Sequence, residues 1–452
     1  MKQSLRAALH TLGCKVNEYE TDAMRSSLEE AGFTIVDFRE RADVYVINTC
    51  SVTNIADRKS RQMISRARHQ NPDAVVVAVG CYVQTALEKT GKNVDADILI
   101  GSGKKGTLVE ELEKYYARSG SLPQMPSLLK EHSLPQHSCT VSDVMHERKY
   151  EDLSVPRIEG HTRAWIKVQD GCSQFCSYCI IPFARGRSRS RKMQDILDEV
   201  GALASQGVLE VVLTGIHLSS YGRDFDTDPC GLIDLIEAVS GVGGIKRVRL
   251  GSLEPTIITE AFVKRLCEVG EICPHFHLSL QSGCDSVLKR MNRHYTTKEY
   301  LRSMELLRSA FDRPAITTDV IVGFPGERAK EFECTRDFLE RAQFYETHLF
   351  RYSMRAGTKA ALMPDQIPES VKEERLADLQ ALDKEMRRRF EHSWDGREVS
   401  VLFEERAQID ENENMLYTGY TREYIRVYTH SAEDLRGQIR RGKLNGNLAI
   451  LC

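Results

Sequence analysis

The sequence predicts an α/β protein with three folded parts: an open parallel α/β sheet, a partial (βα)6 barrel and a small all-β barrel. Three observations predict this order. Apolar, β-branched runs alternate with helical patterns over residues 1–118, as in parallel sheets. The alternation resumes with a different spacing over 161–360. Residues 397–452 carry only short alternating segments, which are typical of a small barrel.

The first part, residues 1–118, alternates strand and helix signals. Its strand signals lie at Arg6–Gly13, Asp43–Asn48, Ala74–Gly80 and, more weakly, Asp97–Gly101. Its helical patterns lie at Tyr19–Ala31, Ile55–His69, Gln84–Lys89 and Gly106–Arg118. Because a helix follows each strand, the strands are expected to run parallel in one open sheet.

Three cysteines follow the first three of these strands directly. They are Cys14, Cys50 and Cys81. Ligands of open α/β sheets collect at the carboxyl ends of the strands, so the three thiols are expected to converge there. The alternative is that they are small buried residues that fill strand ends, as free cysteine often does.

Residues 119–160 are expected to form a linker, because they are rich in Ser, Pro and His and show poor periodicity. Cys139 within it is expected to be an ordinary thiol.

The central part, 161–360, contains six strand signals separated by helices. The strands are expected at Trp165–Val168, Leu209–Leu213, Arg247–Leu250, Phe276–Leu280, Thr318–Val322 and Thr347–Tyr352. The helices are expected at Met193–Ser205, Leu232–Val239, Ile258–Val269, Tyr300–Phe311 and Glu331–Arg341. Six units are too few for a full eight-stranded barrel, so a partial barrel is predicted.

The loop after its first strand holds Cys172, Cys176 and Cys179. A cubane of four irons and four sulfides needs four thiolates to be closed, and no further cysteine follows before Cys230. One iron would therefore stay open, and S-adenosylmethionine could chelate it through its amino and carboxylate groups. Zinc, with His161 as a fourth ligand, and a disulfide are the alternatives.

Residues at the other strand ends of the barrel are candidates to bind this cofactor, most through polar groups or exposed backbone, and Val322 and Gly323 as an apolar surface for adenine. They are Thr214, Gly215, Ser252, Glu254, Ser279, Gln281, Val322 and Gly323. Each is also compatible with ordinary strand-end chemistry.

The last two parts are a helical connector over 361–396, with its helix at Glu369–Phe390, and the barrel over 397–452. Barrel strands are expected at Glu398–Phe403, Met415–Tyr420, Tyr424–Tyr428, Gln438–Arg441 and Leu448–Leu451. Arg422 and Arg426 lie near Tyr420, Tyr424 and Tyr428, a mixture suited to phosphates and stacked bases. The alternative is a solvated barrel surface.

A second basic run, with Arg185, Arg187 and Arg189, follows the Cys172–Cys179 loop. Two basic regions around one site favour a polyanionic substrate. A solvated helix start is the alternative for this run.

Composition sets the remaining limits. The chain has 452 residues, 41% hydrophobic and 28% charged, with a net charge of −3. No apolar run reaches the roughly 20 residues of a membrane span, and the N-terminus does not read as a secretory signal. The 13 cysteines are therefore expected in a reducing, cytoplasmic setting, where metal binding outranks disulfides.

Taken together, these motifs resemble the radical S-adenosylmethionine methylthiotransferases over essentially the whole chain. The resemblance implies an auxiliary 4Fe–4S cluster on Cys14, Cys50 and Cys81 and a radical 4Fe–4S cluster on Cys172, Cys176 and Cys179. It also implies that the C-terminal barrel is a TRAM domain. The segments around Cys14 and Cys50 and residues 171–191 are similar to the branch that acts on threonylcarbamoyladenosine at position 37 of tRNA. Phe183 departs from the tyrosine of that branch.

The resemblance further implies a mechanism. One S-adenosylmethionine methylates a sulfide on the auxiliary cluster, and a second is cleaved to a 5′-deoxyadenosyl radical. That radical takes hydrogen from C2 of the adenine, which then receives the methylthio group. The resemblance also implies two partners, an electron donor such as flavodoxin or ferredoxin and a sulfur source. It implies no contact with a membrane.

Two alternatives concern the substrate and one concerns the chemistry. The isopentenyladenosine branch and the ribosomal-protein branch share all six cysteines. Lys15, beside a cluster ligand, is a candidate partner for the carboxylate of threonylcarbamoyladenosine. A zinc-containing RNA-binding protein without catalysis is the third alternative.

Overall fold

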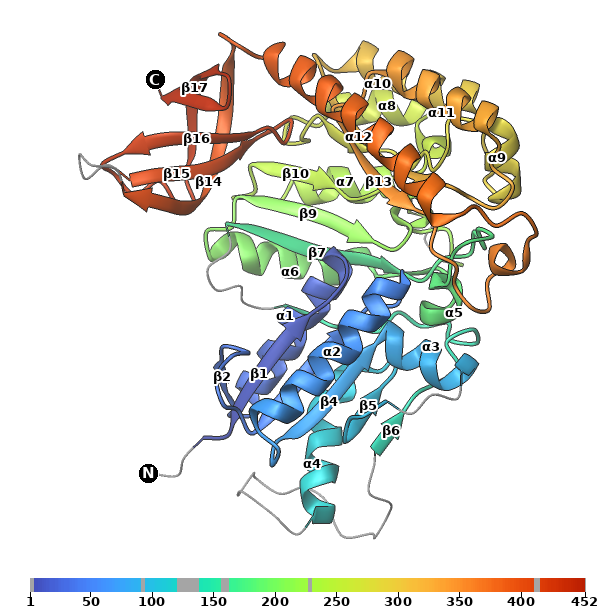
Figure 1. Ribbon diagram of the computed structural model, residues 1–452. Helices are drawn as coiled ribbons and strands as arrows, with labels where there is room; N and C mark the ends of the chain where they lie inside the picture. Colours follow the sequence, from blue (N-terminus) through green and yellow to red (C-terminus); the bar gives the residue numbers. More distant parts are fainter. Residues whose placement is uncertain are drawn as a thin grey trace. The chain divides into compact units, whose positions relative to one another are not determined.

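The computed structural model describes residues 4–90, 94–119, 138–155, 162–226, 230–409 and 415–451 (Figure 1). It divides into two compact units, each built from several stretches of the chain. The first unit consists of Met1–Arg157, Gln169–Arg191 and Ser353–Ala361. The second unit consists of Ile158–Val168, Lys192–Tyr352 and Leu362–Cys452. In the described part of the chain no helix has the length and apolar character needed to cross a membrane.

The first unit contains a six-stranded, wholly parallel sheet in the order β2-β1-β3-β4-β5-β6. Its strands are β1 (Arg6–Thr11), β2 (Thr34–Val36), β3 (Val44–Thr49), β4 (Val75–Gly80), β5 (Ile98–Ile100) and β6 (Ser138–Thr140). Its helices are α1 (Lys15–Glu30), α2 (Asn54–Gln70), α3 (Cys81–Thr90) and α4 (Leu108–Ser119), with the short turn η1 (Lys105–Thr107).

Alternate residues of the central strands face two separate cores. Val44 and Val46 pack with Met24 and Leu28 of α1 on one face, where α4 also lies. Tyr45 and the other intervening residues pack with α2 and α3 on the opposite face. Both faces are covered, so β3 and β4 are buried throughout, as predicted for a parallel sheet.

Two short edge strands, β2 and β6, were not predicted. The edge strand β6 lies within the predicted linker and places Cys139 opposite Leu99 of β5. The linker prediction is therefore wrong for residues 138–155, where Val144, Leu153 and Val155 are buried. Residues 120–137 and 156–161 of the predicted linker, including His161, lie outside the described residues.

The predicted partial barrel is confirmed, with all six strands present. They are β7 (Arg163–Asp170), β9 (Glu210–Gly215), β10 (Arg247–Leu250), β11 (His275–His277), β12 (Ala315–Val322) and β13 (Glu346–Arg351). The sheets run in the orders β10-β9-β7-β8 and β11-β12-β13, where β8 (Arg189–Ser190) is a short antiparallel addition to β7. A parallel bridge between Leu253 and Leu278 joins them.

Helices alternate with these strands along the chain, and the first of them, α5, is part of the first unit. They are α5 (Ile181–Arg185), α6 (Met193–Ser205), α7 (Leu232–Ser240), α8 (Glu260–Glu268), α9 (Asp285–Arg290), α10 (Thr297–Ala310) and α11 (Ala329–Ala342). The shorter turns are η2 (Leu218–Ser220), η3 (Pro255–Ile257) and η4 (Lys359–Leu362). Of these helices, α5 and α9 were not predicted from the periodicity.

The C-terminal part of the second unit is a helix followed by a closed β-barrel. The connector is α12 (Glu369–His392). The barrel has the order β14-β15-β16-β18-β17, with β14 (Glu398–Ile409), β15 (Met415–Thr421), β16 (Arg426–Ser431), β17 (Ile439–Asn445) and β18 (Leu448–Leu451). The predicted five-stranded barrel is therefore confirmed; its core includes Val401, Phe403 and Val427.

A buried charged and aromatic cluster joins this barrel to the strands of the second unit. Arg249 Nε donates to Glu210 Oε1 at 2.9 Å, and Arg163 Nε donates to Glu404 Oε1 at 2.6 Å. The rings of Tyr420 and Tyr424 stack at 4.6 Å, with Arg163 lying 4.9 Å from the centroid of Tyr420. Both tyrosines thus pack in this joint, which is a different role from the base stacking predicted for them.

Glu210 is the acidic centre of this joint and gives a pH-dependent prediction. Burial alone raises the pKa of its carboxyl, but the charges of Arg249 and Arg163 outweigh burial and lower that pKa to about 2. Because the folded pKa lies below the unfolded value, this stabilisation is present above about pH 4.5 and is lost as pH falls toward 2. At pH 7 we expect the free energy of unfolding of Glu210→Gln to be about 3 kcal/mol below that of wild type, so the variant should unfold at a lower urea concentration.

The difference in free energy of unfolding between wild type and Glu210→Gln should narrow as the pH falls from 5 toward 3. In this range the unfolded wild-type chain binds a proton at Glu210, whereas the folded chain keeps the carboxylate ionised until about pH 2. Urea midpoints over this pH range check this, with Glu268→Gln as a control because Glu268 is exposed on α8. Parallel pH curves for wild type and Glu210→Gln would contradict the role given to Glu210.

Candidate metal centre

The three N-terminal cysteines lie at one edge of the first sheet. Cys14 is the N-cap of α1, Cys50 follows β3 directly, and Cys81 is the first residue of α3, directly after β4. Strands β1, β3 and β4 are adjacent and parallel, so their carboxyl ends meet at the same edge. The structure therefore places the three thiols where the strand pattern predicts them.

Gly13 shows how closely the first two cysteine loops approach. Its φ is +113°, and a Cβ added there would lie 3.0 Å from Cys50 Sγ. Only glycine combines this backbone conformation with this contact. Burial, together with the charges that Cys81 and Cys14 would carry as thiolates, raises the pKa of Cys50 to about 12. A bound metal ion would instead lower the pKa of Cys50, because a coordinating thiol is deprotonated.

The loop with Cys172, Cys176 and Cys179 lies between β7 and α5 and is held by backbone hydrogen bonds. The Cys172 N–H donates to the carbonyl of Gly186 at 3.0 Å, and the Ala360 N–H donates to that of Ser177 at 2.8 Å. Gly171 precedes the loop with φ +70°, and a Cβ there would lie 2.0 Å from Arg187 O. The loop thus presents its thiols from a constrained backbone.

The two cysteine triads belong to the same compact unit. Helix α5, which begins two residues after Cys179, packs on α3, which begins with Cys81. Arg185, the last residue of α5, lies close enough to Cys81 for the thiolate to raise the pKa of its guanidinium, although burial opposes this. Helix packing therefore brings together two cysteine-bearing segments that are far apart in sequence.

Arg185 is also the centre of a buried ion-pair network. It is 1% exposed, and its Nη1 lies 2.7 Å from Glu20 Oε1 and 3.0 Å from Asp170 Oδ1. Its Nη2 donates to Asn17 Oδ1 at 2.8 Å. Lys105 Nζ lies 2.9 Å from the other oxygen of Glu20, so this carboxylate has a second cationic partner. Such a network is stable only while every member is present.

The sequence did not indicate that residues 353–361 belong beside the first triad. Arg355 Nη1 lies 2.8 Å from Asp57 Oδ2, and its Nη2 donates to Ser51 Oγ at 2.8 Å. Ser51 directly follows Cys50. About 300 residues separate the partners, and no local pattern marks such a contact.

Each triad offers three thiol ligands, and none of these six cysteines is in a disulfide. A cubane binds each thiolate to a different iron, so three thiols leave one iron open. A closed structural zinc site has four protein ligands. The ligand number of each triad therefore fits a 4Fe–4S cluster with one open iron.

The predicted S-adenosylmethionine contacts lie at strand ends in the second unit. Thr214 and Gly215 end β9, and Val322 ends β12. Ser252 and Glu254 follow β10, while Ser279 and Gln281 follow β11. Gln281 has φ +71° and is bridged to Val320. These residues thus come from successive strands, and their role in cofactor binding stays a prediction.

Two of these candidates have evident structural partners. Glu254 lies 3.0 Å from His217 Nε2 and 2.9 Å from Arg293 Nη2, and these contacts lower the pKa of its carboxyl although burial raises it. Gly323 has φ +70°, and a Cβ there would lie 2.3 Å from Lys372 Cγ. Contact with α12 is therefore sufficient to require glycine at this position.

The basic residues predicted to contact substrate fall into two groups. Arg187 and Arg426 are exposed, and Lys15 is half-buried at the start of α1. Arg189 is buried like Arg185, and Arg422 donates to the carbonyls of Gly270 and Ile272 at 2.6 Å. Contact with a polyanion thus stays a prediction for the first group. Arg185, Arg189 and Arg422 instead donate hydrogen bonds to other residues of the chain.

Two family descriptions match the chain. Residues 6–101 match "Uncharacterized protein family UPF0004", and residues 166–339 match the "Radical SAM superfamily". The first range covers the sheet with Cys14, Cys50 and Cys81, and the second contains the Cys172–Cys179 loop.

Characterised relatives match over nearly the whole chain. The threonylcarbamoyladenosine tRNA methylthiotransferase MtaB of Bacillus subtilis is 40% identical over 97% of this chain and 93% of its own length. MtaB of Aquifex aeolicus is 36% identical over 90% and 95%. The tRNA-2-methylthio-N(6)-dimethylallyladenosine synthase of Acetivibrio thermocellus is 32% identical over 97% and 88%.

Among solved structures, the radical S-adenosylmethionine methyltransferase TsrM of Kitasatospora setae, with cobalamin and a [4Fe-4S] cluster bound, shares the fold. The TM-score is 0.55 at 16% identity, over 77% of this chain and 72% of that chain. The radical SAM match and the methylthiotransferase relatives establish 4Fe–4S clusters and S-adenosylmethionine as the cofactors. The chain therefore belongs to the radical S-adenosylmethionine tRNA methylthiotransferase family.

Proposed function

We propose that this chain methylthiolates C2 of threonylcarbamoyladenosine at position 37 of tRNA, giving 2-methylthio-threonylcarbamoyladenosine. The observation that carries the proposal is the pair of cysteine triads in one unit, Cys14–Cys50–Cys81 and Cys172–Cys176–Cys179, joined through α3 and α5. The branch follows from relatives: MtaB enzymes reach 40% identity, against 32–34% for the dimethylallyladenosine synthases.

When bound, the two clusters and S-adenosylmethionine supply the radical and the methylthio group. The chain's own residues hold and position them. Six thiolates bind the clusters, Gly13 and Gly171 allow their loops to pack closely, and Arg185 places a buried cation beside Cys81. Residues at the ends of β9 to β12, such as Thr214, are proposed to bind S-adenosylmethionine.

Two further partners and a compartment belong to this proposal. A low-potential electron donor of the flavodoxin or ferredoxin type would reduce the radical cluster, and a sulfur source would replace the transferred sulfur. Because tRNA is the proposed substrate, the cytoplasm is the proposed compartment.

Nucleoside mass spectrometry tests the function. Cells that lack this protein should accumulate threonylcarbamoyladenosine in tRNA and regain its 2-methylthio form when the gene is restored. Gain of methylthiolated isopentenyladenosine, or of a methylthiolated ribosomal-protein peptide, would assign the chain to another branch. Anaerobically purified protein should contain about eight irons per chain, whereas zinc without iron would favour a non-catalytic RNA-binding protein.

Lys15 gives a prediction about branch choice. It directly follows the cluster ligand Cys14, and a carboxylate that enters a shielded site needs a nearby cation. We expect Lys15→Gln to reduce kcat/KM for threonylcarbamoyladenosine tRNA about tenfold, equivalent to about 1.4 kcal/mol, mainly through KM. Steady-state assays on modified anticodon stem-loops measure this.

The control is Lys298→Gln, because Lys298 is an exposed lysine on α10. Unchanged kinetics in Lys15→Gln, with the same preference between the two modified adenosines, would remove Lys15 from substrate recognition.

A further inference from the structure

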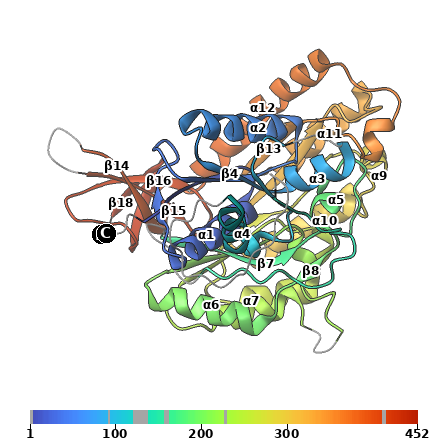
Figure 2. The same cartoon turned by 90° about the horizontal axis from the view of Figure 1, so that it is seen from below.

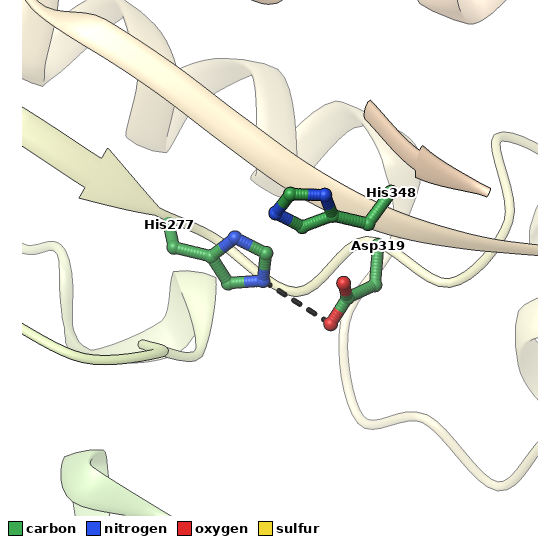
Figure 3. Close-up of side chains that lie close together, drawn as sticks. All are labelled: His277, Asp319 and His348. Atoms are coloured by element: carbon green, nitrogen blue, oxygen red, sulfur yellow. Dashed lines mark hydrogen bonds and ion pairs between the residues drawn. The ribbon is translucent and has the colours of Figure 1, made fainter. Parts of the chain in front are cut away.

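Three metal-ligating side chains meet in the second unit, away from both cysteine triads in sequence. His277, Asp319 and His348 come from the neighbouring strands β11, β12 and β13 and converge in Figure 3. Their ligand atoms all lie within 4.8 Å of one another. Among the residues that the structure describes, this is the one group of three His, Cys, Asp or Glu that does so.

Strand register explains why they share a face. His277 is opposite Thr317 and Asp319 is opposite His348, and paired residues of parallel strands point to the same side. Thr317 and Asp319 are two residues apart, so all four side chains face one way. Phe276 and Leu278 point the other way, into the apolar core beneath the helices. The group therefore lies on the sheet face opposite the helices.

The contacts within the group resemble those of a metal site with an outer hydrogen-bonding partner. His277 Nε2 lies 3.1 Å from Asp319 Oδ2, and His277 Nδ1 lies 3.0 Å from Thr317 Oγ1. Ligating imidazoles typically use one nitrogen for the metal and the other for such a partner. Thr317 would thus fix the orientation of His277 while its Nε2 binds an ion.

His348 leaves the third side of the group accessible. Its ring stacks on that of His277 at 5.5 Å with 21° between the planes, and it is exposed, whereas the side chain of His277 is 12% exposed. In the described part of the chain, neither ring nitrogen of His348 has a hydrogen-bond partner. The group therefore combines two anchored ligands with one that is open to an incoming ion.

We propose that His277, Asp319 and His348 bind one divalent transition-metal ion, with at least one coordination position left for water or an oxygen donor. Two imidazoles and one carboxylate are a ligand set used for zinc and for non-haem iron. Ligand atoms about 2.1 Å from one ion lie at most about 4.2 Å apart, so small side-chain rotations close the site. The ion is separate from the iron of the two clusters.

The alternative is that no ion binds. The group would then be a hydrogen-bonded His277–Asp319 pair with His348 stacked beside it. The same chain offers a matched comparison, because His392 at the end of α12 and Asp395 just beyond it form a similar pair at 2.6 Å, with no third ligand among the described residues. A site that needs three ligands should respond to loss of His348 and ignore loss of His392.

The experiment uses the full chain with both clusters reconstituted, so that the cluster thiols do not bind zinc. After equilibrium dialysis against micromolar Zn²⁺ and removal of excess, metal analysis should give about one zinc per chain for wild type and His392→Ala. His348→Ala and Asp319→Asn should retain less than a tenth of that zinc at unchanged iron content. An anomalous difference peak at the zinc edge should lie between the three side chains.

Equal zinc in wild type, His348→Ala and Asp319→Asn would overturn the proposal, as would no zinc in wild type. His348 is exposed, so its replacement is not expected to impair folding, and iron content and thermal midpoint verify this. Neither readout depends on methylthiolation, so failure of the proposed function leaves this test intact.

Discussion

Cys81→Ala should abolish methylthiolation, by at least 100-fold, while S-adenosylmethionine cleavage stays within a few-fold of wild type. Cys81 belongs to the first triad, so its loss removes a ligand of the auxiliary cluster and leaves Cys172, Cys176 and Cys179 intact. Iron content should fall from about eight to about four per chain. The measurements are 5′-deoxyadenosine formation, methylthiolated nucleoside and iron, each on anaerobically purified protein.

The structure indicates that this substitution should not disturb the fold. Cys81 is the first residue of α3 and is 3% exposed, and alanine is a good helix former that is smaller than cysteine. Cys139→Ala is the matched control, because Cys139 lies on the same sheet in β6 and belongs to neither triad. Full methylthiolation by Cys81→Ala would refute the role of the first triad, and loss of both activities would indicate that the two cysteine sites are not separable.

The second large effect is expected for Arg185→Met, which removes the central cation of the buried network. Methionine retains much of the side-chain volume, so the change isolates charge. It leaves the buried Glu20 with Lys105 alone and the buried Asp170 with the more distant Arg189, whose Nη2 lies 3.9 Å away. Removing one partner of a buried ion pair costs about 3–5 kcal/mol, a large part of the stability of a domain.

The measurement for Arg185→Met is the urea midpoint at which cluster absorbance is lost, since Arg185 lies beside Cys81. Arg187→Met is the control, because Arg187 is exposed two residues away and should change stability by less than about 0.5 kcal/mol. If Arg185→Met also changed the free energy of unfolding by less than about 0.5 kcal/mol, the network would not stabilise the cluster-binding unit.

The sequence was sufficient for the order of the parts and for most of their elements. Alternating strand and helix signals predicted the parallel sheet and the six-stranded partial barrel, because hydrophobic period and turn residues are local properties. The strands after which Cys14, Cys50 and Cys81 lie were located for the same reason. Edge strand β6 was missed, because three residues with one buried side chain carry no clear period.

Side-chain pairing was much less predictable. Arg185 reads as part of a basic, solvent-facing run, yet its guanidinium bonds to Glu20 and Asp170 in the interior. Tyr420 and Tyr424 read as a surface for bases, yet they pack against Arg163 and Arg249. In each case the deciding partner comes from a segment more than ten residues away, and local composition does not identify it.

The sequence by itself was sufficient to predict the chemistry of the cysteines, because the ligand type and the spacing of Cys172, Cys176 and Cys179 are properties of one short segment. It also determined the fold class. Only the tertiary structure decided which residues surround those cysteines: Arg185 beside Cys81, and Arg355 beside the loop of Cys50. It alone brought His277, Asp319 and His348 together, because strand order and register are set by the packing of the whole sheet and not by any single strand.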